Sequence, residues 1–264
     1  MKPPIYTVDA FAERKFAGNP AGVCVLDEAA DEAWMRQIAR EMNLSETAFV
    51  HRMGALWKLR WFTPAAEVKL CGHATLATSH ILWTEGYADR STPIEFSTLS
   101  GILNATLRDD GRITLAFPPL PESPVEPPPE IMEALGVTPL HVGQSRDDYL
   151  ALVNTPETVK SLKPNFALLH KLNVRGVMVT AQGDGQPYDF VSRFFAPGVG
   201  IDEDPVTGSA HCCLGPFWAA RLGKNKMLAY QASARGGVLE VQVEPERIHL
   251  TGKAFTVFKG RVAE

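Results

Sequence analysis

The sequence lacks the features of several protein classes. No apolar run reaches the length of a membrane span. The opening MKPPIYTVDA has two prolines and no apolar core of a secretory signal. A formal net charge of −4 over 264 residues gives no general attraction to nucleic acid or to an anionic membrane. With 45% apolar and 21% charged residues, the composition is typical of a soluble globular protein.

Cysteine is scarce, and its spacing matches no disulfide or zinc pattern. Cys24, Cys71, Cys212 and Cys213 form no C-x-x-C pair, and adjacent cysteines rarely pair with each other. We therefore expect reduced thiols and a cytoplasmic protein. His211 lies too close in sequence to Cys212 and Cys213 for tetrahedral metal ligation, so we expect these two cysteines in the core.

Common nucleotide and nucleophile motifs are also missing. The run GVGIDE at 198–203 lacks the third glycine of a dinucleotide fingerprint. The chain has neither a phosphate-loop Gly-Lys-Ser nor a G-x-S-x-G elbow.

The chain does contain one pattern twice. Residues 23–43 and 149–173 each predict a strand followed by a helix that ends at an asparagine. A predicted hairpin follows each, with strands at 47–53 and 56–64 in the first copy. The second hairpin has strands at 176–181 and 187–197 around the turn QGDGQ. Landmarks recur at offsets of 130, 133, 136 and 135 residues, which predicts a duplicated domain: Asn43 and Asn173, Phe62 and Phe195, Gly72 and Gly208, Gly101 and Gly236.

A proline-rich segment separates the two copies. Seven of the fourteen residues in FPPLPESPVEPPPE, at 117–130, are proline. This predicts a stiff polyproline linker rather than a helix or a central strand. We therefore predict an N-terminal domain over 1–118, a linker over 119–130 and a C-terminal domain over 131–264.

Two segments predict helices that are buried on every side. Residues 72–84 and 208–220 contain no Lys, Arg, Asp or Glu, and they stop at Gly86 and Gly223. We therefore predict an α+β fold of two similar domains, each a β-barrel-like curled sheet around a central buried helix. Pro216 is expected to kink or delay the second helix.

Both predicted helices begin at a glycine, Gly72 and Gly208. The unpaired N–H groups of a helix start carry partial positive charge, and glycine lets an anion approach them. We predict that the two starts face each other across the domain crevice and hold the carboxylate of a small acid or an enolate formed from it. The alternative is that the glycines serve only tight packing and that Ser209 is an N-cap.

Three ionisable residues are candidates for proton transfer. Glu46 precedes an apolar strand, where the pKa of a carboxyl can rise toward that of a general base; a capping or solvated role is the alternative. His73 lies in the first turn of a predicted helix, where the dipole disfavours a charged imidazole. Asp204 precedes the second helix, but the residues alone do not separate it from Asp202 and Glu203.

Five segments spread over nearly the whole chain carry a family resemblance: YTVDAFAERKFAGNPAGV, NLSETAFV, EVKLCGHATLA, IDEDPVTGSAH and QASARGG. In these segments the chain resembles the PhzF-like isomerases of phenazine biosynthesis, a branch of the diaminopimelate epimerase fold. The resemblance implies two similar β-barrels, each wrapped around a central helix, with the active site between them.

The resemblance also implies roles for individual residues. Glu46 matches the catalytic glutamate, which takes a proton from a substrate carbon and returns it elsewhere. The other matching positions are His73 and Asp204 as catalytic residues, Ser209 as a polar contact, Gly72 as a backbone donor and Asn19 in a loop lining the cleft; Gly208, the second helix start, joins the substrate-binding set.

The same resemblance implies no metal, flavin or nicotinamide cofactor. It implies a small carboxylic acid as substrate and a homodimer. The net charge and the lack of a membrane-length apolar run predict no nucleic-acid or membrane partner. A phenazine precursor is only one candidate substrate.

One departure bears on mechanism. Related epimerases and racemases use one cysteine at each helix start, and here Cys71 matches the first position but Thr207 stands at the second. Threonine is a very poor proton donor or acceptor at neutral pH, so a two-thiol racemase is disfavoured. A racemase or epimerase that uses Cys71 as one base, and a non-catalytic binder of small acids, remain as alternatives.

Overall fold

The computed structural model describes residues 2–183 and 187–263, and the chain divides into two compact units. The first unit comprises Met1–Phe117 together with Leu250–Glu264, and the second comprises Pro118–His249. Among the described residues, no helix combines the length and apolar character needed to cross a membrane.

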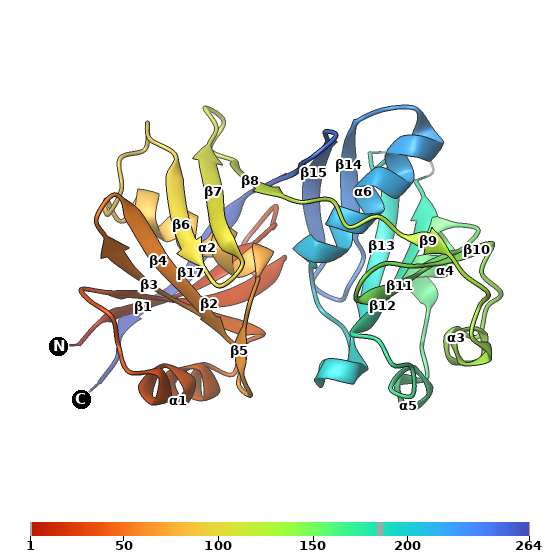
Figure 1. Cartoon of the computed structure of the whole chain (residues 1–264), viewed down its shortest axis with the longest axis horizontal. Helices are drawn as coiled ribbons and strands as arrows, with labels where there is room; N and C mark the ends of the chain where they lie inside the picture. Colours follow the sequence, from red (N-terminus) through yellow and green to blue (C-terminus); the bar gives the residue numbers. More distant parts are fainter. Residues whose placement is uncertain (1, 184–186, 264) are drawn as a thin grey trace. The chain divides into compact units, whose positions relative to one another are not determined.

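The first unit is a curled mixed sheet with two helices (Figure 1). Its elements are β1 (Pro4–Ala10), β2 (Asn19–Leu26), α1 (Glu32–Met42), β3 (Glu46–Met53), β4 (Leu56–Phe62), β5 (Glu67–Val68), α2 (Gly72–Thr84), β6 (Ile94–Thr98), β7 (Gly101–Leu107), β8 (Ile113–Phe117) and β17 (Ala254–Arg261). β1 pairs antiparallel with β2 and β17, and β2 pairs parallel with β3. The β3–β4 hairpin is antiparallel, β4 runs parallel to β6, and β6, β7 and β8 form an antiparallel meander.

The helix α2 lies inside this sheet. It has the predicted bounds, and it packs against β1, β2, β3, β8 and β17. Its buried hydroxyl groups donate to carbonyls one turn earlier: Thr75 to Cys71, Thr78 to Ala74 and Ser79 to Thr75, at 2.6, 2.7 and 2.8 Å. Such local bonds let an uncharged helix bury polar side chains without leaving those groups unsatisfied.

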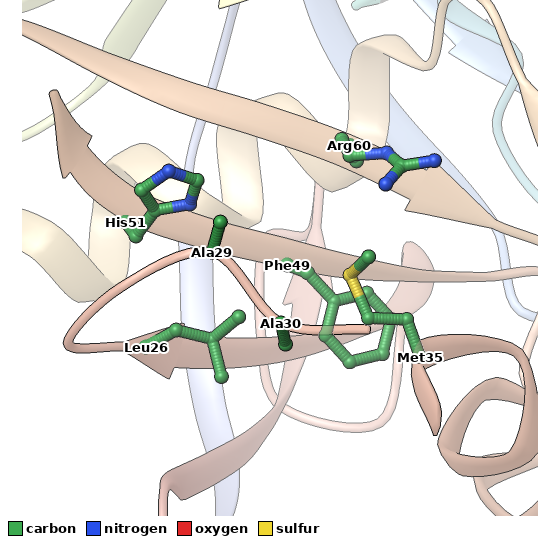
Figure 2. A pocket seen from close by; sticks show the side chains of 7 residues that line it. All are labelled: Leu26, Ala29, Ala30, Met35, Phe49, His51 and Arg60. Carbon is green, nitrogen blue, oxygen red and sulfur yellow. The ribbon is translucent and has the colours of Figure 1, made fainter. Parts of the chain in front are cut away.

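The strand β3 has different neighbours on its two faces. Side chains alternate along a strand, and Phe49 packs edge to face on Trp34 of α1 and on Phe62. Figure 2 shows a small pocket on this α1 side, lined by Leu26, Ala29, Ala30, Met35, Phe49, His51 and Arg60. Glu46, three residues before Phe49, therefore faces the opposite side, toward α2.

The elements of the second unit are β9 (Ser123–Pro124), α3 (Pro129–Leu135), β10 (His141–Gln144), β11 (Asp148–Leu152), α4 (Pro156–Ser161), α5 (Phe166–Leu169), β12 (Gly176–Gln182), β13 (Phe190–Phe195), the 3₁₀ turn η1 (Pro197–Val199), α6 (Gly208–Leu222), β14 (Lys226–Gln231) and β15 (Gly237–Val243). The strand β16 (Ile248–Gly252) begins in the second unit, and its residues from Leu250 onward belong to the first. Its central helix α6 packs on β14 and β15. On α6, Trp218 stacks on Phe190 and donates to Thr180 at 3.0 Å.

The two units share one connectivity, which confirms the predicted internal repeat and fold class. The pairs β1–β2 and β10–β11 are antiparallel, and β2–β3 and β11–β12 are parallel. The hairpins β3–β4 and β12–β13 precede the parallel pairs β4–β6 and β13–β14, and each central helix lies between those strands in sequence. The landmarks agree: Phe62 and Phe195 end their strands, and Gly72 and Gly208 begin their helices.

One predicted helix in the second copy is wrong. The segment at 149–173 forms two short helices, α4 and α5, and Asn173 lies beyond both. Pro164 lies between them; proline has no N–H and disfavours helical backbone in the residue before it, so one continuous helix cannot form. In the predicted turn QGDGQ, residues 184–186 lie outside the described residues.

The proline-rich segment is attached to the second unit. β9 pairs with β10, and the Val125 N–H donates to the Val142 carbonyl at 3.1 Å. The Leu120 N–H donates to the Cys212 carbonyl of α6 at 3.0 Å. Pro216 lies inside α6 and has no N–H to give to that carbonyl, four residues earlier, so Leu120 supplies the missing donor.

The end of the chain differs from the predicted boundaries, which placed 131–264 in one domain. Residues 250–264 belong to the first unit. The physical reason is strand pairing, because β17 pairs with β1 from Pro4 with Arg261 to Ala10 with Ala254. The sheet of the first unit is therefore completed by the last strand of the chain.

Candidate functional site

In the first unit, Glu46 and His73 come together. Glu46 begins β3 and His73 lies in the first turn of α2, and Glu46 Oε2 is 3.2 Å from His73 Nε2. The side chain of His73 is 6% exposed and that of Glu46 is 15% exposed. At this distance and burial, the carboxylate and the imidazole face each other with little competition from water.

Burial holds His73 neutral. It lowers the pKa of His73 to about 3, because desolvation disfavours the charged ring. The direction agrees with the sequence expectation, although burial rather than the helix dipole is the main cause. At neutral pH the imidazole therefore carries one proton, on one of its two nitrogens.

Asn19 decides which nitrogen carries that proton. Its amide nitrogen Nδ2 lies 3.2 Å from His73 Nδ1. An amide nitrogen only donates, so Nδ1 accepts and the ring proton sits on Nε2, facing Glu46. Asn19 is fully buried at the first position of β2. Its predicted place among substrate-binding residues stays a prediction, but its contact in the structure is with His73.

The backbone before Asn19 needs its glycine. Gly18 has φ +67°, and a Cβ there would lie 2.3 Å from the Ala10 carbonyl oxygen. Only glycine fits this turn. The motif AGNP therefore encodes the placement of the Asn19 amide.

Cys71 lies beside the same nitrogen of His73 as Asn19. It is the N-cap residue of α2, it is buried, and its Sγ lies 3.5 Å from His73 Nδ1. Glu46, Cys71 and His73 offer donor atoms within 4.8 Å of one another, a set that could be considered for a metal. Glu46 approaches Nε2 and Cys71 approaches Nδ1, so the two side chains lie nearest to different nitrogens of the ring.

In the second unit, the side chain of Asp204 accepts a hydrogen bond from Thr207, the N-cap residue of α6. The Thr207 hydroxyl donates to Asp204 Oδ2 at 2.6 Å. The two acidic neighbours of Asp204 have different surroundings. Glu203 pairs with Arg193 at 2.7 and 2.8 Å, and Asp202 is exposed. Thr207 makes no side-chain capping bond to α6, so its hydroxyl serves Asp204 instead.

The remaining predicted residues occupy the helix starts. Gly72 is the first residue of α2, and Gly208 and Ser209 are the first two of α6. Ser209 is therefore not the N-cap; Thr207 is. Cys212 and Cys213 are buried in α6, and burial raises the pKa of each thiol to about 12, as expected for unreactive core residues.

Sequence reasoning missed Gln231. It ends β14, is fully buried, and bonds to both Asp204 and Thr207. The signal lay in the segment QASARGG, where an amide ends an alternating strand. The pocket of Figure 2 lies on the opposite face of β3 from Glu46 and contains none of the predicted residues.

A family model, related sequences and solved structures all indicate the same protein family. The family described as phenazine biosynthesis-like protein (PhzC-PhzF) matches residues 8–260. An uncharacterized isomerase from Halalkalibacterium halodurans is 50% identical to this chain over 99% of each. The crystal structure of a PhzF family protein from Enterococcus faecalis superposes with a TM-score of 0.95 at 43% identity and covers 100% of both chains.

A more distant structure shares the fold alone. It is a hydroxyproline epimerase from Agrobacterium vitis, solved with trans-4-hydroxy-L-proline bound. It is 12% identical, with a TM-score of 0.66 over 99% of this chain and 92% of that one.

Proposed function

Because the chain belongs to the phenazine biosynthesis-like (PhzC-PhzF) family and bacterial relatives 47–50% identical to it are named as uncharacterized isomerases, we propose that it moves a carbon-bound proton on a small carboxylic acid without a cofactor. Glu46 is the general base and then the general acid. The observation that carries this role is the 3.2 Å approach of Glu46 Oε2 to a buried, neutral His73.

The proton would travel on one face of the substrate. Glu46 takes it from one carbon, and the electron pair left there is delocalised into the acid. A neutral His73 with a pKa of about 3 does not compete for the proton near pH 7. Glu46 therefore keeps the proton and returns it at a second carbon, which completes an isomerisation with no net change in protons.

We propose further roles for the remaining predicted residues. The N–H groups at Gly72 and Gly208 stabilise the developing negative charge, and His73, Asp204 and Ser209 orient the acid. The support for Asp204 and Ser209 is the family resemblance of the segment IDEDPVTGSAH.

The experiment begins with a thermal-shift screen of small cyclic and amino carboxylic acids. Each acid that raises the melting temperature is incubated with enzyme in D₂O, and deuterium in the acid is measured by mass spectrometry. We expect uptake with the wild type and at least about 100-fold slower uptake with Glu46→Gln. The matched control is Glu41→Gln, an exposed residue of α1, which should exchange at the wild-type rate.

The alternatives give other results. Unchanged exchange in a folded Glu46→Gln variant would remove the role of Glu46. Loss of exchange in Cys71→Ser, which our proposal expects to remain active, would favour a Cys71-dependent racemase or epimerase. An acid that stabilises the protein but never gains deuterium would favour a non-catalytic binder.

A further inference from the structure

The buried amide of Gln231 joins the two residues that precede α6. Its Oε1 accepts from the Thr207 N–H at 2.8 Å. Its Nε2 donates to the Asp204 carbonyl at 2.7 Å and to Thr207 Oγ1 at 3.2 Å. The amide oxygen faces a donor and the amide nitrogen faces two acceptors, so all three hydrogen bonds form in only one orientation of the amide.

This amide determines where the Thr207 hydroxyl donates its proton. Because Thr207 Oγ1 accepts from Gln231 Nε2, its own proton points elsewhere, and Asp204 Oδ2 lies 2.6 Å away. The bonds therefore run in one sense, from Gln231 to Thr207 to Asp204, and they end on a carboxylate oxygen. A short donor of this kind fixes the side chain of Asp204 and favours its ionised form, as does the positive charge of Arg175.

Other contacts hold the surrounding backbone independently. The Asp204 N–H donates to the Phe194 carbonyl at 3.0 Å, and the Ser233 hydroxyl donates to the Pro205 carbonyl at 2.8 Å. Arg193 holds Glu203 and also donates to the Leu162 carbonyl at 2.7 Å. Loss of the Gln231 bonds should therefore release the Asp204 side chain without unfolding the loop.

We infer that Gln231 is a positioning residue that orients the Asp204 carboxylate through the hydroxyl of Thr207. The inference rests on the proposed function, in which Asp204 orients the substrate. It explains why a threonine stands at this helix start, because its hydroxyl is committed to Asp204. A cysteine there would be a much weaker donor.

The first test needs no substrate. The carboxyl carbon of Asp204 is followed by ¹³C NMR from pH 2.5 to 7 in uniformly labelled protein and assigned with Asp204→Asn. We expect Thr207→Val to move the titration midpoint upward by about one pH unit, because the donor to the charged form is lost. Thr207→Ser should keep the wild-type midpoint. Gln231→Glu should also raise it, because the new carboxylate accepts the Thr207 proton and adds a negative charge.

Two controls separate positioning from general damage. Ser233→Ala removes a bond to the same loop without touching the Asp204 carboxylate, and it should leave the midpoint unchanged. Melting temperatures identify any variant that fails to fold, and Gln231→Leu gives a second uncharged test if Gln231→Glu is unstable. A midpoint that stays at the wild-type value in folded Thr207→Val and Gln231→Leu would overturn the inference.

The second test separates this inference from the proposed function. Deuterium uptake is measured with the best acid from the screen, and Thr207→Val and Gln231→Glu are expected to lower it about tenfold, with Thr207→Ser near wild type. If Glu46→Gln abolishes uptake while the Gln231 and Thr207 variants match wild type, the positioning role is wrong and the proposed function stands. If Glu46→Gln exchanges normally, the proposed function fails, while the NMR result still decides whether Gln231 controls Asp204.

Discussion

At the scale of single residues, the amide of Asn19 determines which nitrogen of His73 carries the ring proton. Asn19 donates to one nitrogen of His73, and the ring proton is left on the other, 3.2 Å from Glu46. The sequence indicated Glu46 and His73 as ionisable residues near apolar elements, but it gave Asn19 only a loop position. The contact among them depends on three elements that are distant in sequence.

Replacing Asn19 by aspartate should change the charge of His73. A carboxylate at each ring nitrogen favours the imidazolium, so the pKa of His73 should rise from about 3. The wild type should show no His73 limb in its pH–rate profile between pH 5 and 8, whereas Asn19→Asp should show one and should exchange about 10-fold to 100-fold more slowly at neutral pH. Imidazole ¹H–¹⁵N spectra from pH 4 to 8 give the tautomer directly.

The control for this change is Asn104→Asp, the same substitution at an exposed position of β7. It should leave the His73 signals and the exchange rate unchanged. A wild-type spectrum with the proton on Nδ1 would contradict the assignment of Asn19 as donor.

At the scale of elements, α6 carries a proline that the sequence marked as a problem. The structure shows how the fold accommodates it. Pro216 leaves the Cys212 carbonyl without its helical donor, and the Leu120 N–H replaces that donor at 3.0 Å. The proline-rich segment therefore has a structural function in the second unit.

This arrangement predicts a coupled pair of substitutions. Leu120→Pro removes the donor and should lower the free energy of unfolding by about 1–3 kcal/mol more than Leu120→Ala, which keeps the N–H. In a Pro216→Ala background the new N–H of residue 216 can bond to Cys212, so the difference between the two Leu120 variants should shrink. Urea unfolding of the set measures this coupling; equal differences in both backgrounds would show that the Leu120 bond does not replace the helical one.

At the scale of the whole molecule, the chain leaves its first unit and returns to it. The second unit is inserted between Phe117 and Leu250, and β17 then pairs with β1 along Pro4–Ala10. The predicted repeat was correct about the architecture of each unit, a curled sheet with a central helix. It did not show that the last strand belongs with the first unit, because composition and periodicity do not specify the partner of a strand.

This topology predicts the behaviour of fragments. A chain of residues 1–117 lacks β17, so the β1 edge is exposed, and we expect aggregation or no cooperative unfolding. Residues 1–117 joined to 250–264 by about ten Gly and Ser residues restore β17, and we expect a cooperative thermal transition with near-ultraviolet dichroism. Equal folding of both fragments would show that β17 is dispensable.

The sequence by itself determined the local elements: two helices with long uncharged segments and with glycine at their starts and ends, two alternating hairpins and a repeat of one connectivity. These follow from side-chain period and backbone preference, which act over a few residues. Only the tertiary structure decided that Asn19 and Glu46 meet His73, that Gln231 reaches Thr207, that Leu120 serves Pro216, and that β17 closes on β1. Those contacts join distant segments, and their partners are set by packing and strand register rather than by any local pattern.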